Sequence, residues 1–303
     1  MAILDSHNHF PSGLTPEAMI SVMDQLQVRK IVLMALKTKW GPTREQSTLT
    51  AYEKYPDRVI PFIGLNGVSP ISRAVLEYVD GQLATGQFRG MGELLSRHYG
   101  FSKVTGSGTA LEAGDYTIPM DSPGPLDLMC LAAKHNAVLI VHMETTVETV
   151  PALERALQRN PTTKVIWAHQ THIKTFNGST AQHARKADPE QIASLLDKYP
   201  NLYADIAPGF ESRYLTSGDG RLPDKWKNLY ERYSDRFVVG LDGPFLANWE
   251  EPAGGVARSA KVIRNWLSKN LTPSTQRKLA AENMERILEA KPSPGSPCEF
   301  LTN

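Results

Sequence analysis

The sequence predicts an α/β fold of the (β/α)8 or TIM-barrel type, formed by a single domain with long loops after its strands. Three observations predict it. Eight short apolar runs recur along the 303 residues, a helical pattern follows each run, and the runs are apolar almost throughout, as buried parallel strands are. An open doubly wound sheet is the alternative, and it is disfavoured because no glycine-rich phosphate turn follows the first run.

Each predicted strand is a short run of mainly apolar and β-branched residues. Residues 137–142, for example, read Ala-Val-Leu-Ile-Val-His. The fourth run is weaker, but Gly86 and a long glycine- and serine-containing stretch bound it. In chain order, the eight predicted strands occupy residues 3–5, 30–35, 59–65, 88–95, 137–142, 164–169, 201–207 and 237–242.

The predicted helices carry start signals and one-sided apolar spacing. The first begins with Thr15 as its cap and Pro16 at its first position, and Met19 and Met23 lie on one face. The helices that follow are predicted at residues 43–54, 69–84, 125–135, 147–159, 189–199, 223–233, 256–267 and 273–290. The barrel therefore spans residues 1–290, and the proline- and serine-rich residues 291–303 are predicted to form a C-terminal tail.

Composition limits the classes of partner. Lys and Arg number 33 against 32 Asp and Glu, so charge offers no argument for a nucleic-acid or membrane-surface partner. No apolar run reaches membrane-span length. Cys130 lies in an apolar helical pattern and is expected to be a small buried residue without a disulfide, far in sequence from Cys298. We expect a cytoplasmic protein with a small-molecule substrate, unless the first residues replace a removed leader, and homo-oligomer formation is open.

Metal-ligand side chains stand at the ends of the predicted strands. His7 and His9 follow the first run, and residues two apart on a strand point to the same side, where two imidazoles suit Zn²⁺. This motif is weak alone. Catalytic groups of a barrel lie at the carboxyl ends of its strands. There the other runs carry Glu93, His142, His169 and Asp242.

Each of these residues also has a simple structural interpretation. A strand-end histidine can be a core residue with a satisfied hydrogen bond, Glu93 can pair with a nearby arginine, and Asp242 can form an Asx turn. All of these interpretations must hold together to remove the metal site, and that combination is improbable.

The order of these residues resembles the amidohydrolase superfamily of metal-dependent hydrolases, in its amidohydrolase-2 branch. Residues 199–206 resemble the approach to the seventh strand of that branch, residues 235–242 its eighth strand, and residues 282–288 its closing helix. The resemblance runs from residue 3 to about residue 290. It is specific for the superfamily and does not identify a substrate.

The resemblance implies a ligand set. His7 and His9 would bind one divalent metal, expected to be Zn²⁺, together with Asp242. His142 and His169 would bind a second ion, or His169 would polarise the water when only one ion is bound. Glu93 occupies the place of a bridging carboxylate, as in TatD-like relatives, which leaves a count of one or two ions open.

The expected activity is hydrolysis of a small carboxylic ester, lactone or amide. A bound Zn²⁺ lowers the pKa of water to about 7, and Asp242 can accept the proton and pass it to the leaving group. His169 is the second expected catalytic residue. The loops at 96–124, 170–188 and 208–222 hold the candidate substrate-binding residues Arg97, His172 and Arg213.

Three alternatives to hydrolysis fit parts of the same pattern. A non-oxidative decarboxylase of an aromatic or unsaturated carboxylic acid would use the same metal-binding residues. A TatD-like nuclease is suggested by Glu93, but the balanced charge argues against a phosphate-backbone substrate. A barrel that binds metal and ligand without turnover is the non-enzymatic alternative.

Overall fold

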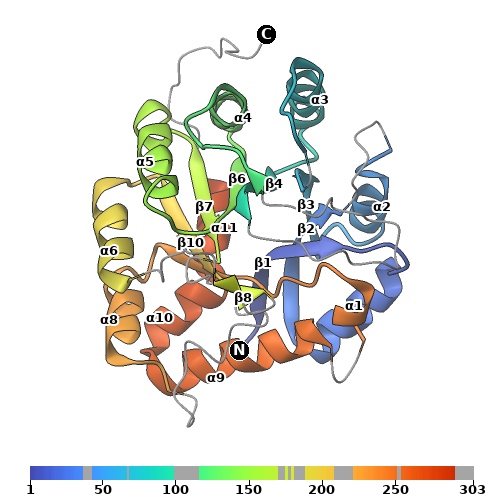
Figure 1. The fold of residues 1–303 in the computed structure, drawn as a ribbon. Helices are drawn as coiled ribbons and strands as arrows, with labels where there is room; N and C mark the ends of the chain where they lie inside the picture. Colours follow the sequence, from blue (N-terminus) through green and yellow to red (C-terminus); the bar gives the residue numbers. More distant parts are fainter. Residues whose placement is uncertain are drawn as a thin grey trace.

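The (β/α)8 prediction is confirmed. The structure is a computed structural model that describes residues 1–36, 43–66, 68–98, 116–169, 175–176, 179–180, 188–207, 221–250 and 254–290. Eight parallel strands follow one another in the order β1-β2-β3-β4-β6-β7-β10-β11. Helices surround these strands (Figure 1). The predicted tail at 291–303 lies outside the described residues.

The barrel strands are β1 (Ile3–Phe10), β2 (Val28–Ala35), β3 (Val59–Gly64), β4 (Gly90–His98), β6 (Val138–Met143), β7 (Lys164–Ala168), β10 (Leu202–Ile206) and β11 (Phe237–Val239). Three further strands are short: β5 (Tyr116–Thr117) pairs antiparallel with β4, and β8 (Thr175–Phe176) pairs with β9 (Ser179–Thr180).

The helices are α1 (Pro16–Gln25), α2 (Gln46–Lys54), α3 (Arg73–Ala84), α4 (Pro123–Lys134), α5 (Thr149–Arg159), α6 (Pro189–Lys198), α8 (Asp224–Arg232), α9 (Gly255–Asn270), α10 (Pro273–Arg277) and α11 (Asn283–Glu289). A 3₁₀ turn, η2 (Leu246–Asn248), follows β11, and a π-helical turn, η3 (Lys278–Glu282), joins α10 to α11. The expected cap of α1 is present, because Thr15 Oγ1 accepts the N–H of Ala18 at 3.2 Å.

Two of the differences from the predicted boundaries concern the candidate site residues. The first strand continues to Phe10, so His7 and His9 lie within it, and all of its residues are buried. The sequence placed its end at Asp5 because polar residues follow. The last strand ends at Val239, so Asp242 lies on the loop beyond it.

Side chains of β1 join it to β11 and close the barrel. Ser6 Oγ donates to the carbonyl of Val239 at 2.8 Å, and the N–H of Leu241 donates to Asp5 Oδ1 at 2.9 Å. Burial raises the pKa of Asp5 to about 7, although its hydrogen bonds oppose the shift. The polar residues of β1 therefore replace part of a backbone ladder along this seam.

Apolar side chains fill the barrel and the layer between strands and helices. Inside the barrel, Leu4, Val32, Phe62 and Ile140 belong to one buried cluster, which Ile287 of α11 joins. A larger cluster lies between the strands and the surrounding helices. With the interior filled in this way, the barrel is a rigid frame for side chains at the carboxyl ends of its strands.

Cys130 corrects the expectation for the cysteines. It is half-buried on α4 and disulfide-bonded, whereas the sequence predicted a small buried residue without a disulfide. The chain contains one other cysteine, Cys298, which lies outside the described residues. Disulfides are uncommon in cytosolic proteins, so this bond does not support the cytoplasmic location expected from the sequence.

None of the helices in the described ranges combines the length and the apolar character needed to cross a lipid bilayer.

Candidate metal centre

Four histidines converge at the carboxyl end of the barrel. His7 and His9 come from β1, His142 from β6, and His169 directly follows β7. The ring centroid of His7 lies 5.4 Å from that of His9 and 5.0 Å from that of His169, which in turn lies 5.1 Å from that of His142. All four side chains are buried, so their nitrogens need partners within this cluster.

Glu93 of β4 lies at the centre of the four rings. Its Oε1 lies 2.8 Å from Nδ1 of His142, 3.2 Å from Nε2 of His169 and 3.7 Å from Nε2 of His7. Its Oε2 lies 3.7 Å from Nε2 of His9. One buried carboxylate therefore faces all four imidazoles, which is the position a ligand shared by two cations would take.

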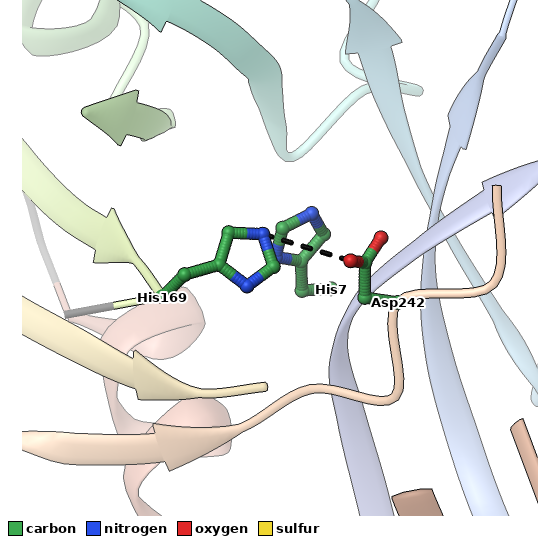
Figure 2. A group of neighbouring side chains, drawn as sticks. All are labelled: His7, His169 and Asp242. Atoms are coloured by element: carbon green, nitrogen blue, oxygen red, sulfur yellow. Dashed lines mark ion pairs between the residues drawn. The ribbon is translucent and has the colours of Figure 1, made fainter. Parts of the chain in front are cut away.

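Asp242 completes the cluster from the loop beyond β11. One of its carboxylate oxygens lies 3.7 Å from Nε2 of His9, and the other lies 3.7 Å from Nε2 of His169. Figure 2 shows His7, His169 and Asp242 pointing toward one another. The Asp242 side chain is 22% exposed, against 6% or less for Glu93 and the four histidines. Asp242 is thus the member of the cluster most open to a substrate.

The backbone at two of these residues is left-handed. His169 has φ of 53° and Asp242 has φ of 47°, a region that few residues other than glycine adopt. The N–H of Asp242 donates to the carbonyl of His7 at 3.0 Å, and the N–H of His169 donates to Asp205 Oδ1 at 2.8 Å. These bonds hold strained turns that aim both side chains into the cluster.

Asp205 of β10 is a functional candidate that sequence reasoning missed. It is fully buried, and its Oδ2 accepts a hydrogen bond from Nδ1 of His7 at 2.7 Å. This bond assigns the proton of His7 to Nδ1 and turns Nε2 toward Glu93. The signal in the sequence was a polar residue inside an otherwise apolar seventh strand.

Glu93 is itself held by Asn66, another residue that the sequence did not single out. Asn66 Oδ1 accepts the N–H of Glu93 at 3.0 Å, and Asn66 Nδ2 lies 3.5 Å from Glu93 Oε2. The buried Arg44 donates to the carbonyls of Gly64 and Asn66 at 2.8 and 2.9 Å. A second layer of polar groups therefore supports the central carboxylate.

The cluster sets the protonation of the histidines. Burial lowers the pKa of His7, His142 and His169, but the negative charges and hydrogen bonds of Glu93 and its acidic neighbours outweigh this effect and raise each pKa, that of His142 to about 9. For His9, burial and the charge of His7 prevail and lower the pKa to about 4. In the metal-free protein, the carboxylates therefore favour the protonated forms of His7, His142 and His169.

The residues present fit a divalent metal. Within the described ranges, His7 Nε2 is buried without a hydrogen-bond partner, as a nitrogen reserved for a cation would be. Three sets have one donor atom per residue, all within 4.8 Å of one another. These sets are His7, His169 and Asp242; His7, His9 and Glu93; and Glu93, His142 and His169. Imidazole and carboxylate donors of this kind suit Zn²⁺ and related divalent ions.

Metal binding is expected to release protons and to strengthen as pH rises. Only neutral imidazoles bind a cation, and the pKa values of His7, His142 and His169 are raised, so protons must leave as the ion enters. Titration calorimetry with Zn²⁺ at pH 6.5, 7.5 and 8.5, in buffers of different ionisation enthalpy, measures both effects. Equal affinity at the three pH values would contradict this protonation pattern.

Replacing Asp205 with Asn is expected to weaken metal binding by about 10- to 100-fold, because the carboxylate no longer orients His7. A competition titration of Zn²⁺ against a chromogenic chelator measures the change. Asp197→Asn, in the exposed part of α6, is the matched control and should bind Zn²⁺ as the wild type does. An unchanged affinity in Asp205→Asn would show that His7 needs no such support.

The three predicted substrate-binding residues have different outcomes. Arg97 lies on β4 beyond Glu93, at the level of Met143 on β6, and its guanidinium donates to Thr117 Oγ1. It is therefore near the mouth of the barrel but outside the histidine cluster. His172 and Arg213 lie outside the described residues, and their roles stay predictions.

Comparison with known proteins identifies the family of most of the chain. The family model described as Amidohydrolase matches residues 5–289. No curated protein matches the sequence.

Several solved structures share the fold. A protein from Acinetobacter baumannii described as a probable 2-pyrone-4,6-dicarboxylic acid hydrolase, with citric acid bound, is 15% identical (TM-score 0.57; 95% of this chain and 99% of that one). A 4-oxalomesaconate hydratase from Rhodopseudomonas palustris is 11% identical (TM-score 0.55; 94% and 95%). The phosphotriesterase homology protein of Escherichia coli, with phosphate in its active site, is 10% identical (TM-score 0.58; 95% and 100%). Identities this low show the common fold alone.

Proposed function

The chain belongs to the amidohydrolase family of metal-dependent hydrolases, and from this premise we propose that it hydrolyses a small carboxylic ester, lactone or amide. The observation that carries the proposal is the cluster of four buried histidines around Glu93, with the more exposed Asp242 at its edge. This set offers ligands for a cation and a carboxylate placed to move a proton. Zn²⁺ is the proposed metal, as one or two ions.

Most side chains of the cluster would serve as metal ligands, and Asp242 would also transfer a proton. His7, His9 and Asp242 would hold one ion, and Glu93, His142 and His169 a second. When bound, the metal supplies a water of lowered pKa and polarises the substrate carbonyl. Asp242 would accept the proton of the attacking water and deliver it to the leaving group.

Two features of Asp242 support this role. Its left-handed backbone, tied to β1 through the carbonyl of His7, aims the carboxylate at Nε2 of both His9 and His169. The charges of His169 and His7 outweigh the effect of burial and keep the pKa of Asp242 below its usual value. In the metal-free protein, the carboxylate is therefore ionised at neutral pH.

Arg97 would bind a carboxylate of the substrate, because it is the candidate cation on the strand that also carries Glu93. The proposed partner is a small molecule, with no role for nucleic acid or membrane. Assembly of copies and residence in the cytoplasm remain predictions from the sequence.

The proposal is tested with the Zn²⁺-loaded protein and a panel of esters, lactones, amides and aromatic or unsaturated acids. Incorporation of ¹⁸O from labelled water into a carboxylate product supports hydrolysis. Release of CO₂ without ¹⁸O incorporation would replace it with the decarboxylase alternative. Metal binding without turnover on any member of the panel would favour the non-enzymatic alternative.

A further inference from the structure

Glu144 is a buried carboxylate that the proposed mechanism does not use. It directly follows β6 and is fully buried. Its backbone is held on both sides, because its N–H donates to the carbonyl of Arg97 at 3.3 Å and its carbonyl accepts Thr149 Oγ1 at 2.8 Å. A carboxylate taken out of water is costly unless a partner compensates it. Its Oε1 lies 3.3 Å from Nε2 of His142.

His142 therefore lies between two carboxylates. Its Nδ1 faces Glu93 Oε1 at 2.8 Å, inside the histidine cluster, whereas its Nε2 faces Glu144. Residues 142 and 144 are two apart where β6 ends, and this is the spacing at which side chains of an extended chain project to the same side. A neutral imidazole carries its proton on one nitrogen only, and the hydrogen bond at that nitrogen decides which one remains for a cation.

We propose that Glu144 is a positioning residue that accepts the Nε2 proton of His142 and thereby directs Nδ1 of His142 toward the second metal ion. The inference rests on the proposed function, in which Glu93, His142 and His169 hold that ion. A carboxylate that accepts one N–H of a ligating histidine fixes both its tautomer and its ring orientation.

Asp205 and Glu144 contact different ring nitrogens of their respective histidines. Asp205 accepts a hydrogen bond from Nδ1 of His7, so Nε2 of His7 faces the cluster. In the proposal, Glu144 accepts a hydrogen bond from Nε2 of His142, so Nδ1 of His142 faces the cluster. The two histidines thus present different nitrogens to the same central carboxylate, Glu93. Loss of Glu144 should affect the second ion alone, and this separates its role from that of Asp205.

The test compares Glu144→Gln, Glu144→Leu and a control, Glu148→Gln. Gln keeps the shape and one acceptor oxygen, whereas Leu removes the acceptor and leaves an apolar group in a buried place. Glu148 is exposed in the same connection between β6 and α5. Stepwise Zn²⁺ affinities are measured by competition with a chromogenic chelator. Long-range ¹H–¹⁵N spectra of histidine-labelled, Zn²⁺-loaded protein report which nitrogen of His142 carries the proton.

We expect the wild type and Glu148→Gln to bind two Zn²⁺ ions, with His142 protonated at Nε2. Glu144→Leu should bind the first ion as the wild type does and the second about 10- to 100-fold more weakly, with Glu144→Gln between them. Equal second-ion affinity in all four proteins, an unchanged His142 spectrum in Glu144→Leu, or a wild type that binds one ion would overturn the proposal. A protein that shows these shifts but hydrolyses no substrate would refute the proposed hydrolysis and leave the role of Glu144 standing.

Discussion

Removing the divalent metal with a chelator is expected to abolish hydrolysis, and adding Zn²⁺ back should restore it. A metal that ionises water and polarises a carbonyl lowers the barrier by several kcal/mol, which corresponds to a loss of at least about 10³-fold in rate when it is removed. The histidines of the cluster cannot replace the metal in activating water. Without the ion, the pKa values of His7, His142 and His169 are raised, so their protonated forms are favoured, and protonated imidazoles cannot activate water.

The measurement is the rate of product formation before chelation, after dialysis and after addition of Zn²⁺, with metal content followed by elemental analysis. Circular dichroism of the metal-free protein is the control, because a loss of fold would also stop turnover. Full activity in a sample shown to contain no metal would contradict the proposed mechanism.

Replacing Asp242 with Asn is expected to lower kcat by about 10²- to 10⁴-fold, because the amide cannot accept the proton of the attacking water. The size of the side chain is unchanged, and the N–H of residue 242 can still donate to His7. The fold should therefore survive. Since Asp242 is also a proposed metal ligand, the assay is run at saturating Zn²⁺, with the bound metal measured in the same sample.

Asp235→Asn is the matched control for this variant. Asp235 is exposed and lies before β11, at the opposite end of the same strand, where barrel residues serve stability and not catalysis. Its kcat should equal that of the wild type. If Asp242→Asn with bound Zn²⁺ turns over at the wild-type rate, another group must carry the proton.

Much of the fold could be read from local patterns. The eight apolar runs, the helices between them and the cap at Thr15 depend on near neighbours in the chain, and the structure contains them. The ends of elements were less predictable. The first strand passes through polar residues that local reasoning excludes. Ser6 finds its partner on β11 and Asp5 on the loop just beyond it, both more than 230 residues away.

Part of the candidate site could also be predicted from the sequence. His7, His9, Glu93, His142, His169 and Asp242 could be proposed because each lies at or just beyond the carboxyl end of an apolar run, and a barrel brings those ends to one rim. Their use as ligands stays a proposal, but the structure does place them together.

By itself, the sequence determined the barrel and the residue types available at its rim, since both follow from apolar periodicity and from the positions of histidines and carboxylates along the chain. The tertiary structure alone decided which nitrogen each histidine presents. Asp205, Asn66 and Glu144 lie within hydrogen-bond distance of the candidate ligands, on other segments or two positions away. Such bonds require the donor and acceptor atoms to be placed precisely in three dimensions, and no pattern of residue types in the sequence specifies that placement.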